Sequence, residues 1–382
     1  IAIGRAAMLG SDGSTSANNN IAIGFNSMMS VETGVQNISI GNTSLDAMTT
    51  GDNNTCLGHN TMSSLTTGGS NTAIGAFALD ANTTASNNTA VGVDALGANT
   101  TGQNNVAVGA NTLDANTTGA FNTSLGQGSM TSNTTGAASV AVGYAALSAA
   151  TTGGQNSALG YLALQDVTTA TGNTGIGYQA GKDITTGTNN TFIGNNSGIE
   201  QTTATDNTAV GHATLAANTS GDGLVAVGSN CLDANTTGDN LTAIGFDALG
   251  ANTTATNNTA CGSKAGNQIT TGGNNTCVGF DALTRCTTGG NNACLGFEAG
   301  DNITTGSSNV CVGIEAGTNI TQGDNNVCVG NATETSGEAA ANCITIGHNI
   351  SAAGSNTFSF GKASNVVSNT FTSNATFTRS SD

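Results

Sequence analysis

A glycine recurs at every seventeenth position of the chain, from Gly24 to Gly347, with no insertion or deletion. Each of these glycines closes a short apolar step, such as Thr-Ala-Val-Gly at residues 89–92. A fixed short period is typical of stacked repeat architectures, in which each repeat contacts only its neighbours. Length alone would suggest two or three globular domains. The period replaces that expectation with one long solenoid.

We number the 17 positions of a repeat from Asn87, so that Gly92 is position 6. Positions 3 to 5 are short and rich in β-branched residues, which indicates a strand. The glycine at position 6 ends this strand with a backbone geometry that a Cβ would resist. Positions 9 and 10, most often Ala-Leu, form a second apolar stretch, and Asn-Thr-Thr at positions 13 to 15 leads into the returning corner. The sequence therefore predicts an all-β parallel β-solenoid, or β-roll, with a strict 17-residue coil.

The spacing also divides the chain into three segments. Residues 1–18 are expected to form an irregular first coil, with its extra residues in a loop from Ser11 to Ala17. Residues 19–347 are the regular array, and residues 348–382 are a C-terminal cap or transition segment. The tail is richer in aromatic residues than the array, with Phe358, Phe360, Phe371 and Phe377. The chain begins within the pattern, so we interpret it as a fragment or a processed segment.

The side chains at positions 10 and 13 compensate each other in volume. Where position 10 is Gly, as at Gly266, position 13 is Ile, as at Ile269, whereas Leu96 is accompanied by Asn99. A close-packed interior requires such compensation. We therefore place positions 5, 10 and 13 inside the coil. The expected core ladder includes Val91, Leu96, Val108, Leu113, Ile244 and Leu249.

Three features of the array need separate interpretation. Gly198 is followed by Gln201 at position 13, and Ile199 is expected to supply the missing volume. Position 4, mostly Ala or Cys, is expected to form the contact surface between chains. Identical Asn residues at position 2 are expected to bond their side-chain amides along the column, as in stacked cross-β ladders.

Four of the nine cysteines, Cys277, Cys294, Cys311 and Cys328, occupy position 4 of consecutive repeats. We interpret them as small buried core residues. Parallel stacking points their Cβ atoms the same way, which disfavours disulfides, and the close-spaced pairs of a zinc site are missing. Several free thiols favour assembly in a reducing cytoplasm.

Charge and composition exclude several functions. The net charge of −17 disfavours nucleic acid and anionic membrane surfaces as partners, and no apolar run approaches the length of a membrane span. The three histidines are far apart and the carboxylates are scattered, so neither catalytic residues nor a calcium ion in each turn is expected. Six Lys and Arg residues cannot supply the clustered charges of a lyase. We predict no enzyme activity and no cofactor.

The steps Asn-Asn-Ile-Ala-Ile-Gly at 19–24 and Asn-Asn-Val-Ala-Val-Gly at 104–109 resemble the head repeats of trimeric autotransporter adhesins. They are also similar to repeats in bacteriophage tail fibres. The resemblance implies a left-handed parallel β-roll with three chains side by side. The adhesin heads have a shorter repeat, so the added residues should enlarge one corner of the coil. The 14 residues between Gly347 and Gly361 indicate that the last turn returns to the shorter form.

We therefore expect a structural fibre and attachment protein, the shaft or head of a homotrimeric phage tail fibre that contacts a host surface. A bacterial cell-surface trimeric adhesin is the alternative. Tyr144, Tyr161 and Tyr178 occupy position 7 of consecutive turns and should pack on a neighbouring chain or bind a glycan. The expected location is the virion tail or the outer cell surface. An ice-binding solenoid is a third possibility, disfavoured because adjacent Thr at positions 14 and 15 should face opposite ways.

Overall fold

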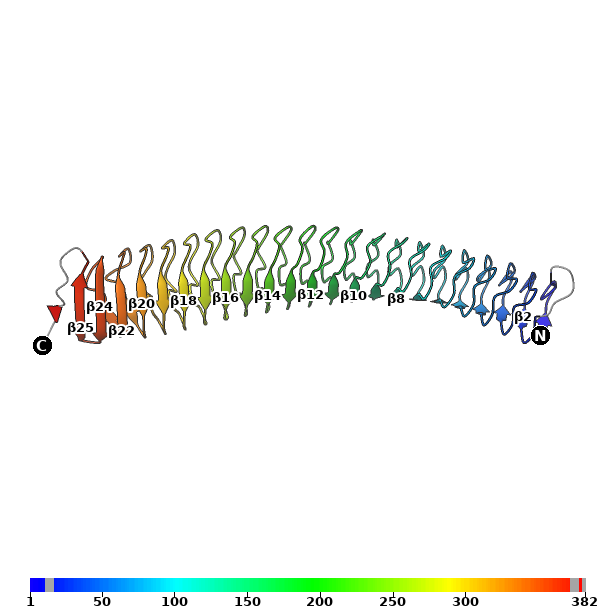
Figure 1. Cartoon of the computed structure of the whole chain (residues 1–382), viewed down its shortest axis with the longest axis horizontal. Helices are drawn as coiled ribbons and strands as arrows, with labels where there is room; N and C mark the ends of the chain where they lie inside the picture. The colour runs from blue at the N-terminus through cyan, green and yellow to red at the C-terminus, as the bar shows by residue number, and fades with distance from the viewer. Residues whose placement is uncertain (11–16, 372–377, 380–382) are drawn as a thin grey trace. The chain divides into compact units, whose positions relative to one another are not determined.

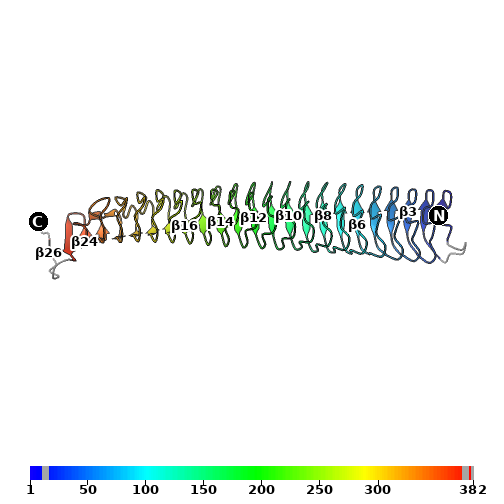
Figure 2. The ribbon, with the colours of Figure 1, turned by 90° about the horizontal axis from the view of Figure 1, so that it is seen from above.

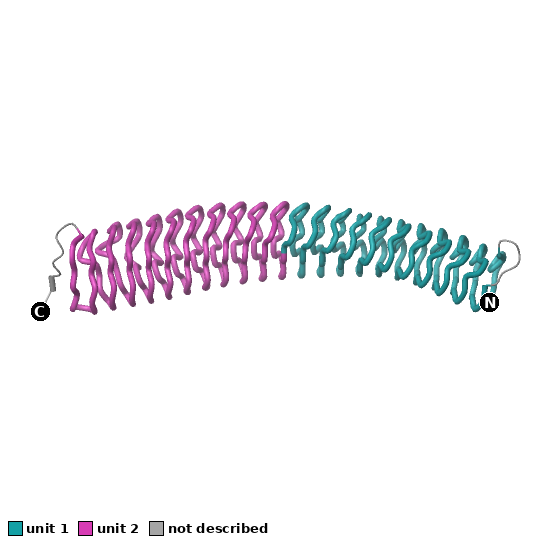
Figure 3. Tube along the Cα trace, viewed as in Figure 1, with its two compact units in different colours: residues 1–190 teal, residues 191–382 magenta. Residues whose placement is uncertain are grey.

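The computed structural model describes residues 1–10, 17–371 and 378–379, and every regular element in these residues is a β-strand. The fold is an all-β parallel β-solenoid with a 17-residue coil, as the sequence predicts. The chain divides into two compact units, unit 1 at residues 1–190 and unit 2 at residues 191–382, coloured separately in Figure 3. Each unit is described by itself below.

The strands of unit 1 lie side by side in chain order (Figure 1). They are β1 (Ala2–Ile3), β2 (Ile21–Ile23), β3 (Ile38–Ile40), β4 (Thr55–Leu57), β5 (Thr72–Ile74), β6 (Thr89–Val91), β7 (Val106–Val108), β8 (Thr123–Leu125), β9 (Val140–Val142), β10 (Ser157–Leu159) and β11 (Thr174–Ile176). Consecutive strands pair in parallel, and in the array each residue lies beside its equivalent in the next turn, as Ala90 beside Ala107. The view in Figure 2 shows the same order.

The glycine at position 6 is required by both its conformation and its neighbour. Gly92 has a φ of +144°, which L side chains rarely adopt, and a Cβ there would overlap the carbonyl oxygen of Gly109 in the next turn. A glycine in this conformation recurs along the column in both units. Glycine therefore recurs with the 17-residue period because successive turns approach each other closely at position 6.

A tight double turn follows each strand. Positions 8 and 10 adopt the left-handed conformation, as at Asp94 (φ 55°) and Leu96 (φ 53°). β-Branched residues are strained there, and from Met28 to Gly317 the array has Leu, Met or Gly at position 10, whereas Glu334 at the next equivalent position lies in strand β21. This turn directs the position 10 side chain into the coil, where Leu96 is fully buried.

Unit 2 continues the same pattern. Its strands are β12 (Thr191–Ile193), β13 (Thr208–Val210), β14 (Val225–Val227), β15 (Thr242–Ile244), β16 (Thr259–Cys261), β17 (Thr276–Val278), β18 (Ala293–Leu295), β19 (Val310–Val312), β20 (Val327–Val329), β21 (Thr333–Glu334), β22 (Ile344–His348), β23 (Ile350–Ser351), β24 (Thr357–Lys362), β25 (Asn365–Thr370) and β26 (Thr378–Arg379). β12 to β20, then β22 and β24, form a parallel ladder, and β21 pairs with β23 separately.

The end of the array closes with antiparallel strands. Gly347 lies beside Gly361, so the last parallel turn has the shorter 14-residue step predicted from the spacing. β25 then pairs antiparallel with β24, and β26 with β25. This hairpin covers the outer edge of β24, as expected for a cap. Phe377 lies outside the described residues, as do residues 11–16 of the loop expected in the first coil.

The core differs from the prediction at one position. Leu96, Leu113 and Leu249 at position 10 are fully buried. Position 5 lies outside: Val91 and Val108 are half-buried, and Ile244 is 41% exposed. Alternation along the strand allows only one of positions 4 and 5 to face inward, and the narrow coil accepts the small residue. The placement of position 5 in the core was therefore wrong, as was position 4 as a contact surface between chains.

The volume exchange between positions 10 and 13 is confirmed. A Cβ added to Gly266 would lie 2.9 Å from Cδ2 of Leu249, 3.0 Å from Cδ1 of Ile269 and 3.4 Å from Sγ of Cys277. The pocket is thus shared by positions 4, 10 and 13. At Gly198 the space is filled by the ring of Phe192 at position 4, 2.5 Å from the added Cβ. The sequence-based assignment of this volume to Ile199 was wrong.

Candidate functional site

The outward side chains at positions 3, 5 and 7, which we call the strand face, form the main apolar surface of each unit. Position 3 and position 5 belong to the strand, and position 7 follows the glycine. Many of their large apolar side chains are 37–51% exposed. In unit 1 these are Phe25, Ile38, Leu57, Ile74, Val93, Val106, Leu125, Val140, Tyr144, Leu159, Tyr161, Ile176 and Tyr178. In unit 2 they are Ile193, Val225, Ile244, Phe246, Val278, Phe280, Leu295, Phe297, Ile314 and Ile346.

Charged residues are absent from the strand face of the array. From residue 21 to residue 348, no Asp, Glu, Lys or Arg occurs at positions 3, 5 or 7. These positions comprise 60 residues in 20 repeats, and the chain average of 8% charged residues would give about five charges at such exposed sites. Position 5 is aliphatic in every repeat except at Cys261. Packing inside the coil does not require aliphatic residues at position 5, because these side chains point outward.

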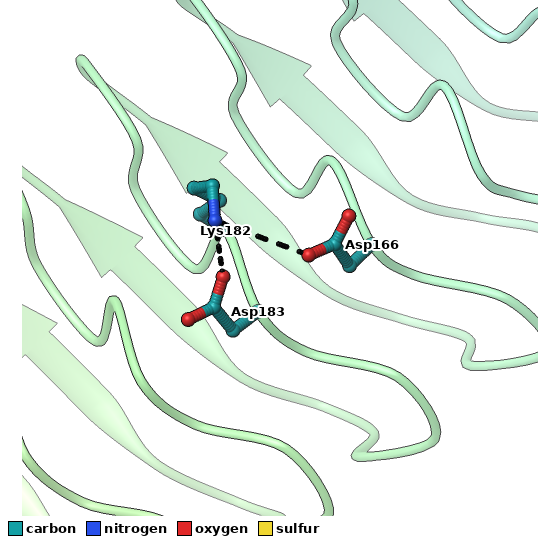
Figure 4. Close-up of polar contacts among 3 residues, drawn as sticks. All are labelled: Asp166, Lys182 and Asp183. Carbon is teal, nitrogen blue, oxygen red and sulfur yellow. Dashed lines mark hydrogen bonds and ion pairs between the residues drawn. The ribbon is translucent and has the colours of Figure 1, made fainter.

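The charges gather on the other sides of the coil. Figure 4 shows Lys182 between Asp166 and Asp183, on the turns beside the strands. Its Nζ lies 2.6 Å from Oδ1 of Asp183 and 4.0 Å from Oδ2 of Asp166. The hydrogen bond to Asp183 raises the pKa of Lys182 above its ordinary value. These residues occupy positions 11 and 12, so the ion pairs lie away from positions 3 and 5.

The tyrosine stripe is a continuous stack of rings. Tyr144 and Tyr161 have ring centroids 5.4 Å apart with planes at 13°, and Tyr161 and Tyr178 are 5.4 Å apart at 6°. Both faces of Tyr161 are therefore covered by its neighbours. A sugar ring that binds an aromatic side chain needs an open face, so the stack presents edges and hydroxyl groups to a partner. This geometry favours packing against another chain over glycan stacking.

The cysteine column is a core feature. Cys277, Cys294, Cys311 and Cys328 are fully buried, free, and stacked in register across the strands. Burial raises the pKa of the Cys277 thiol above its ordinary value. The interpretation as small core residues is confirmed. Among the described residues, no group of three or more His, Cys, Asp and Glu side chains has an arrangement suited to a metal ion.

Polar ladders run inside the coil, in a form only partly expected. Asn105 donates its main-chain N–H to Oδ1 of Asn88 at 2.9 Å, and its Nδ2 donates to the Gly119 carbonyl at 2.9 Å. The position 2 amides therefore bond mainly to the backbone, although some also bond each other. Thr100 at position 14 donates to the Thr117 carbonyl at 3.0 Å, whereas Thr101 at position 15 is exposed. Positions 14 and 15 thus face opposite ways, as predicted.

Comparisons of this chain with protein-family models, with curated proteins and with solved structures gave no match. The fold alone defines the class: the chain is a parallel β-solenoid repeat protein. The residues that the structure describes include no helix long and apolar enough to cross a membrane. What sequence reasoning missed is the identity of the outward face. The signal was present in the missing charges at positions 3, 5 and 7.

Proposed function

We propose that this protein is a structural fibre and attachment subunit whose copies associate through the strand face. The observation that carries the proposal is the uncharged, exposed strand face on a chain with a net charge of −17. Exposed apolar surface of this extent marks an interaction site. The carboxylates lie at other positions, so identical chains can approach at this face without bringing their charges together.

A second copy of the chain is the partner that fits this surface best. The aliphatic rows repeat at the strand spacing, and only a partner with the same period keeps its own rows in register with them over many turns. A strip about 10 Å wide and about 4.8 Å per turn offers about 50 Å² per turn. The ten repeats of each unit would offer about 500 Å² per partner, or about 1,000 Å² buried in total, which reaches the lower bound for a specific interface.

The number of chains and the biological setting are finer parts of the proposal. The resemblance to adhesin heads and tail-fibre repeats supports a left-handed homotrimer. We place it on a virion tail, as the shaft or head that contacts a glycan or protein of the host surface. A bacterial surface adhesin is the alternative with the same geometry. The ice-binding alternative loses support because the exposed threonines form one column, while the adjacent hydroxyls bond within the coil.

The oligomeric state tests the proposal. Light scattering of the purified chain should give a multiple of 37.1 kDa, with three as the expected number. A variant with Ile244→Glu and Leu295→Glu places two charges on the strand face and should dissociate. The control is Thr237→Glu, which adds a charge at exposed position 15 and should leave the assembly intact. A monomeric wild-type chain with the circular dichroism of a β-solenoid would overturn the proposal.

A further inference from the structure

The side chain at position 11 lies beside the carbonyl oxygen of position 8 in the preceding turn. In three turns it donates a hydrogen bond to that carbonyl, across a separation of 20 residues. The pairs are Thr131 Oγ1 with Asn111 O at 3.3 Å, Asn267 Nδ2 with Asp247 O at 3.1 Å, and Thr284 Oγ1 with Lys264 O at 2.9 Å. A hydrogen-bond donor at position 11 can therefore link one turn to the preceding turn.

Aspartate occupies the same position in five turns: Asp46, Asp80, Asp114, Asp233 and Asp301. An ionised carboxylate has no proton to donate to a carbonyl. Asp80 instead accepts a hydrogen bond from the Ser63 hydroxyl. The Oδ1 atoms of Asp46 and Asp301 are buried and make no hydrogen bond. In an ionised state each of these two residues thus has one buried carboxylate oxygen without a hydrogen-bond donor.

The surroundings favour the protonated acid. Burial is the main cause that raises the pKa of Asp46, Asp114 and Asp233 above the ordinary value, and the negative charge of a second carboxylate raises it further at each one. These carboxylates belong to Asp80 for Asp46, to Asp94 for Asp114 and to Asp247 for Asp233. Main-chain N–H groups at Asp46 and Ala47 act in the opposite direction at Asp46, as do those at Asp233 and Ala234.

Asp301 has a more mixed environment. Burial again raises its pKa first, and the Glu298 and Asp281 carboxylates add to this. The Arg285 guanidinium and the Asn302 main-chain N–H lower it. Asp301 is therefore a poorer place to test the effect of a proton than Asp46 or Asp114, where no cation contributes.

We infer that Asp46, Asp114, Asp233 and Asp301 at position 11 are proton-dependent hydrogen-bond links between successive turns. A proton taken from solvent on the carboxylate lets the acid donate to the position 8 carbonyl of the preceding turn, as Thr and Asn do elsewhere in the column. Since the folded chain holds these protons more tightly than the unfolded chain, their contribution to stability is complete below the ordinary Asp pKa. It is lost as the pH rises through the higher folded value. The solenoid gains stability in mild acid.

The test compares unfolding of the full chain in urea at about pH 3.5, below the ordinary Asp pKa, and at about pH 7.5. Asp46→Asn supplies a permanent donor and should raise the midpoint at the higher pH while changing little at the lower pH. Asn267→Asp is the reciprocal change and should lower the midpoint at the higher pH, with recovery in acid. Asn267 already occupies position 11 in another turn, so the side chain introduced by Asp46→Asn is one that this position accommodates.

A charge-matched control separates this effect from general relief of repulsion. Asp52 at position 17 accepts the Val35 N–H at 2.8 Å, so its carboxylate has a structural partner. Asp52→Asn removes the same charge and should leave the midpoint unchanged or lower at the higher pH. The inference is overturned if Asp52→Asn stabilises as much as Asp46→Asn. It is also overturned if the effects of Asp46→Asn and Asn267→Asp are the same at both pH values.

Discussion

The shared pocket of positions 10 and 13 predicts that two harmful substitutions will rescue each other. Gly266→Leu places a side chain where an added Cβ already lies 2.9 Å from Leu249 Cδ2 and 3.0 Å from Ile269 Cδ1. Overpacking of this kind costs about 1–3 kcal/mol. The left-handed backbone at Gly266 (φ +59°) adds about 1 kcal/mol for a residue with a Cβ. We therefore expect the single substitution to cost about 2–4 kcal/mol.

Ile269→Asn removes the aliphatic volume but adds a useful amide. The Oδ1 of Asn252, the equivalent residue one turn earlier, is buried without a hydrogen-bond partner. Asn252 itself donates to Oδ1 of Asn235 at 2.8 Å, so a further asparagine would extend this ladder. Loss of the buried Ile costs about 2–5 kcal/mol, and the new hydrogen bond returns about 1 kcal/mol. The net cost is about 1–4 kcal/mol.

Together the two substitutions recreate the combination of Leu249 and Asn252 in the preceding turn. The double variant should lose only about 1 kcal/mol, mainly from the backbone conformation. A double-mutant cycle should therefore show a coupling of about 2 kcal/mol or more. The measurements are urea unfolding midpoints and hydrogen exchange of the peptides around residues 262–279, because long repeat arrays need not unfold in two states.

The control cycle joins Gly266→Leu with Ile320→Asn, three turns away. Ile320 contacts the pocket of Gly317, and none of the residues around Gly317 is among those around Gly266. Distant sites should be additive within about 0.5 kcal/mol. If the near pair were as additive as the distant pair, the volume exchange would be unrelated to packing. The shared-pocket reasoning would then be refuted.

Two further predictions follow from single residues. Gly92→Ala should destabilise the chain by about 3 kcal/mol or more, because the added Cβ meets the Gly109 carbonyl and the φ is strained. The control is Gly337→Ala, where no atom lies within 4 Å of the added Cβ, and it should change the unfolding midpoint little. In the dissociated chain a maleimide at neutral pH should label Cys261 and spare the eight buried thiols, of which Cys231 has its pKa raised by burial to about 11. Mass spectrometry would count the labels, and fast labelling of Cys277 would contradict the structure. In the assembly proposed above, Cys261 should also become protected.

The period of the sequence determines much of the fold because the backbone itself repeats. Gly92 needs its conformation and its contact with the next turn, so every equivalent turn needs glycine. The exchange between Gly266 and Ile269 could also be read from the sequence, since packing volume is additive along the column. These features are local or repeat at fixed spacing, and a single chain displays them many times.

The sequence does not show in the same way which face of the strand points into the core. Positions 3, 4 and 5 are all apolar or small, as in Thr89, Ala90 and Val91, so alternation alone does not say which side faces the core. The larger residue was placed inside, and the coil proved too narrow for it: Ala90 is fully buried and Val91 is not. Phe192 was missed for a related reason. A large residue at position 4 fits only because Gly198 leaves room for its ring.

Once the inside of the coil is known, the outside carries the functional information. Position 4 must fit the narrow interior, where every residue but Phe192 is small, and position 6 must be glycine, so their repetition reveals only the fold. Nothing inside the coil requires position 5 to be aliphatic, because its side chain points out. Yet from Ile23 to Ile346 it is aliphatic or, once, cysteine. A solvated surface would have no reason to exclude charge so consistently. The uniformity therefore favours a contact outside the coil, which is the physical basis for proposing a second chain on the strand face.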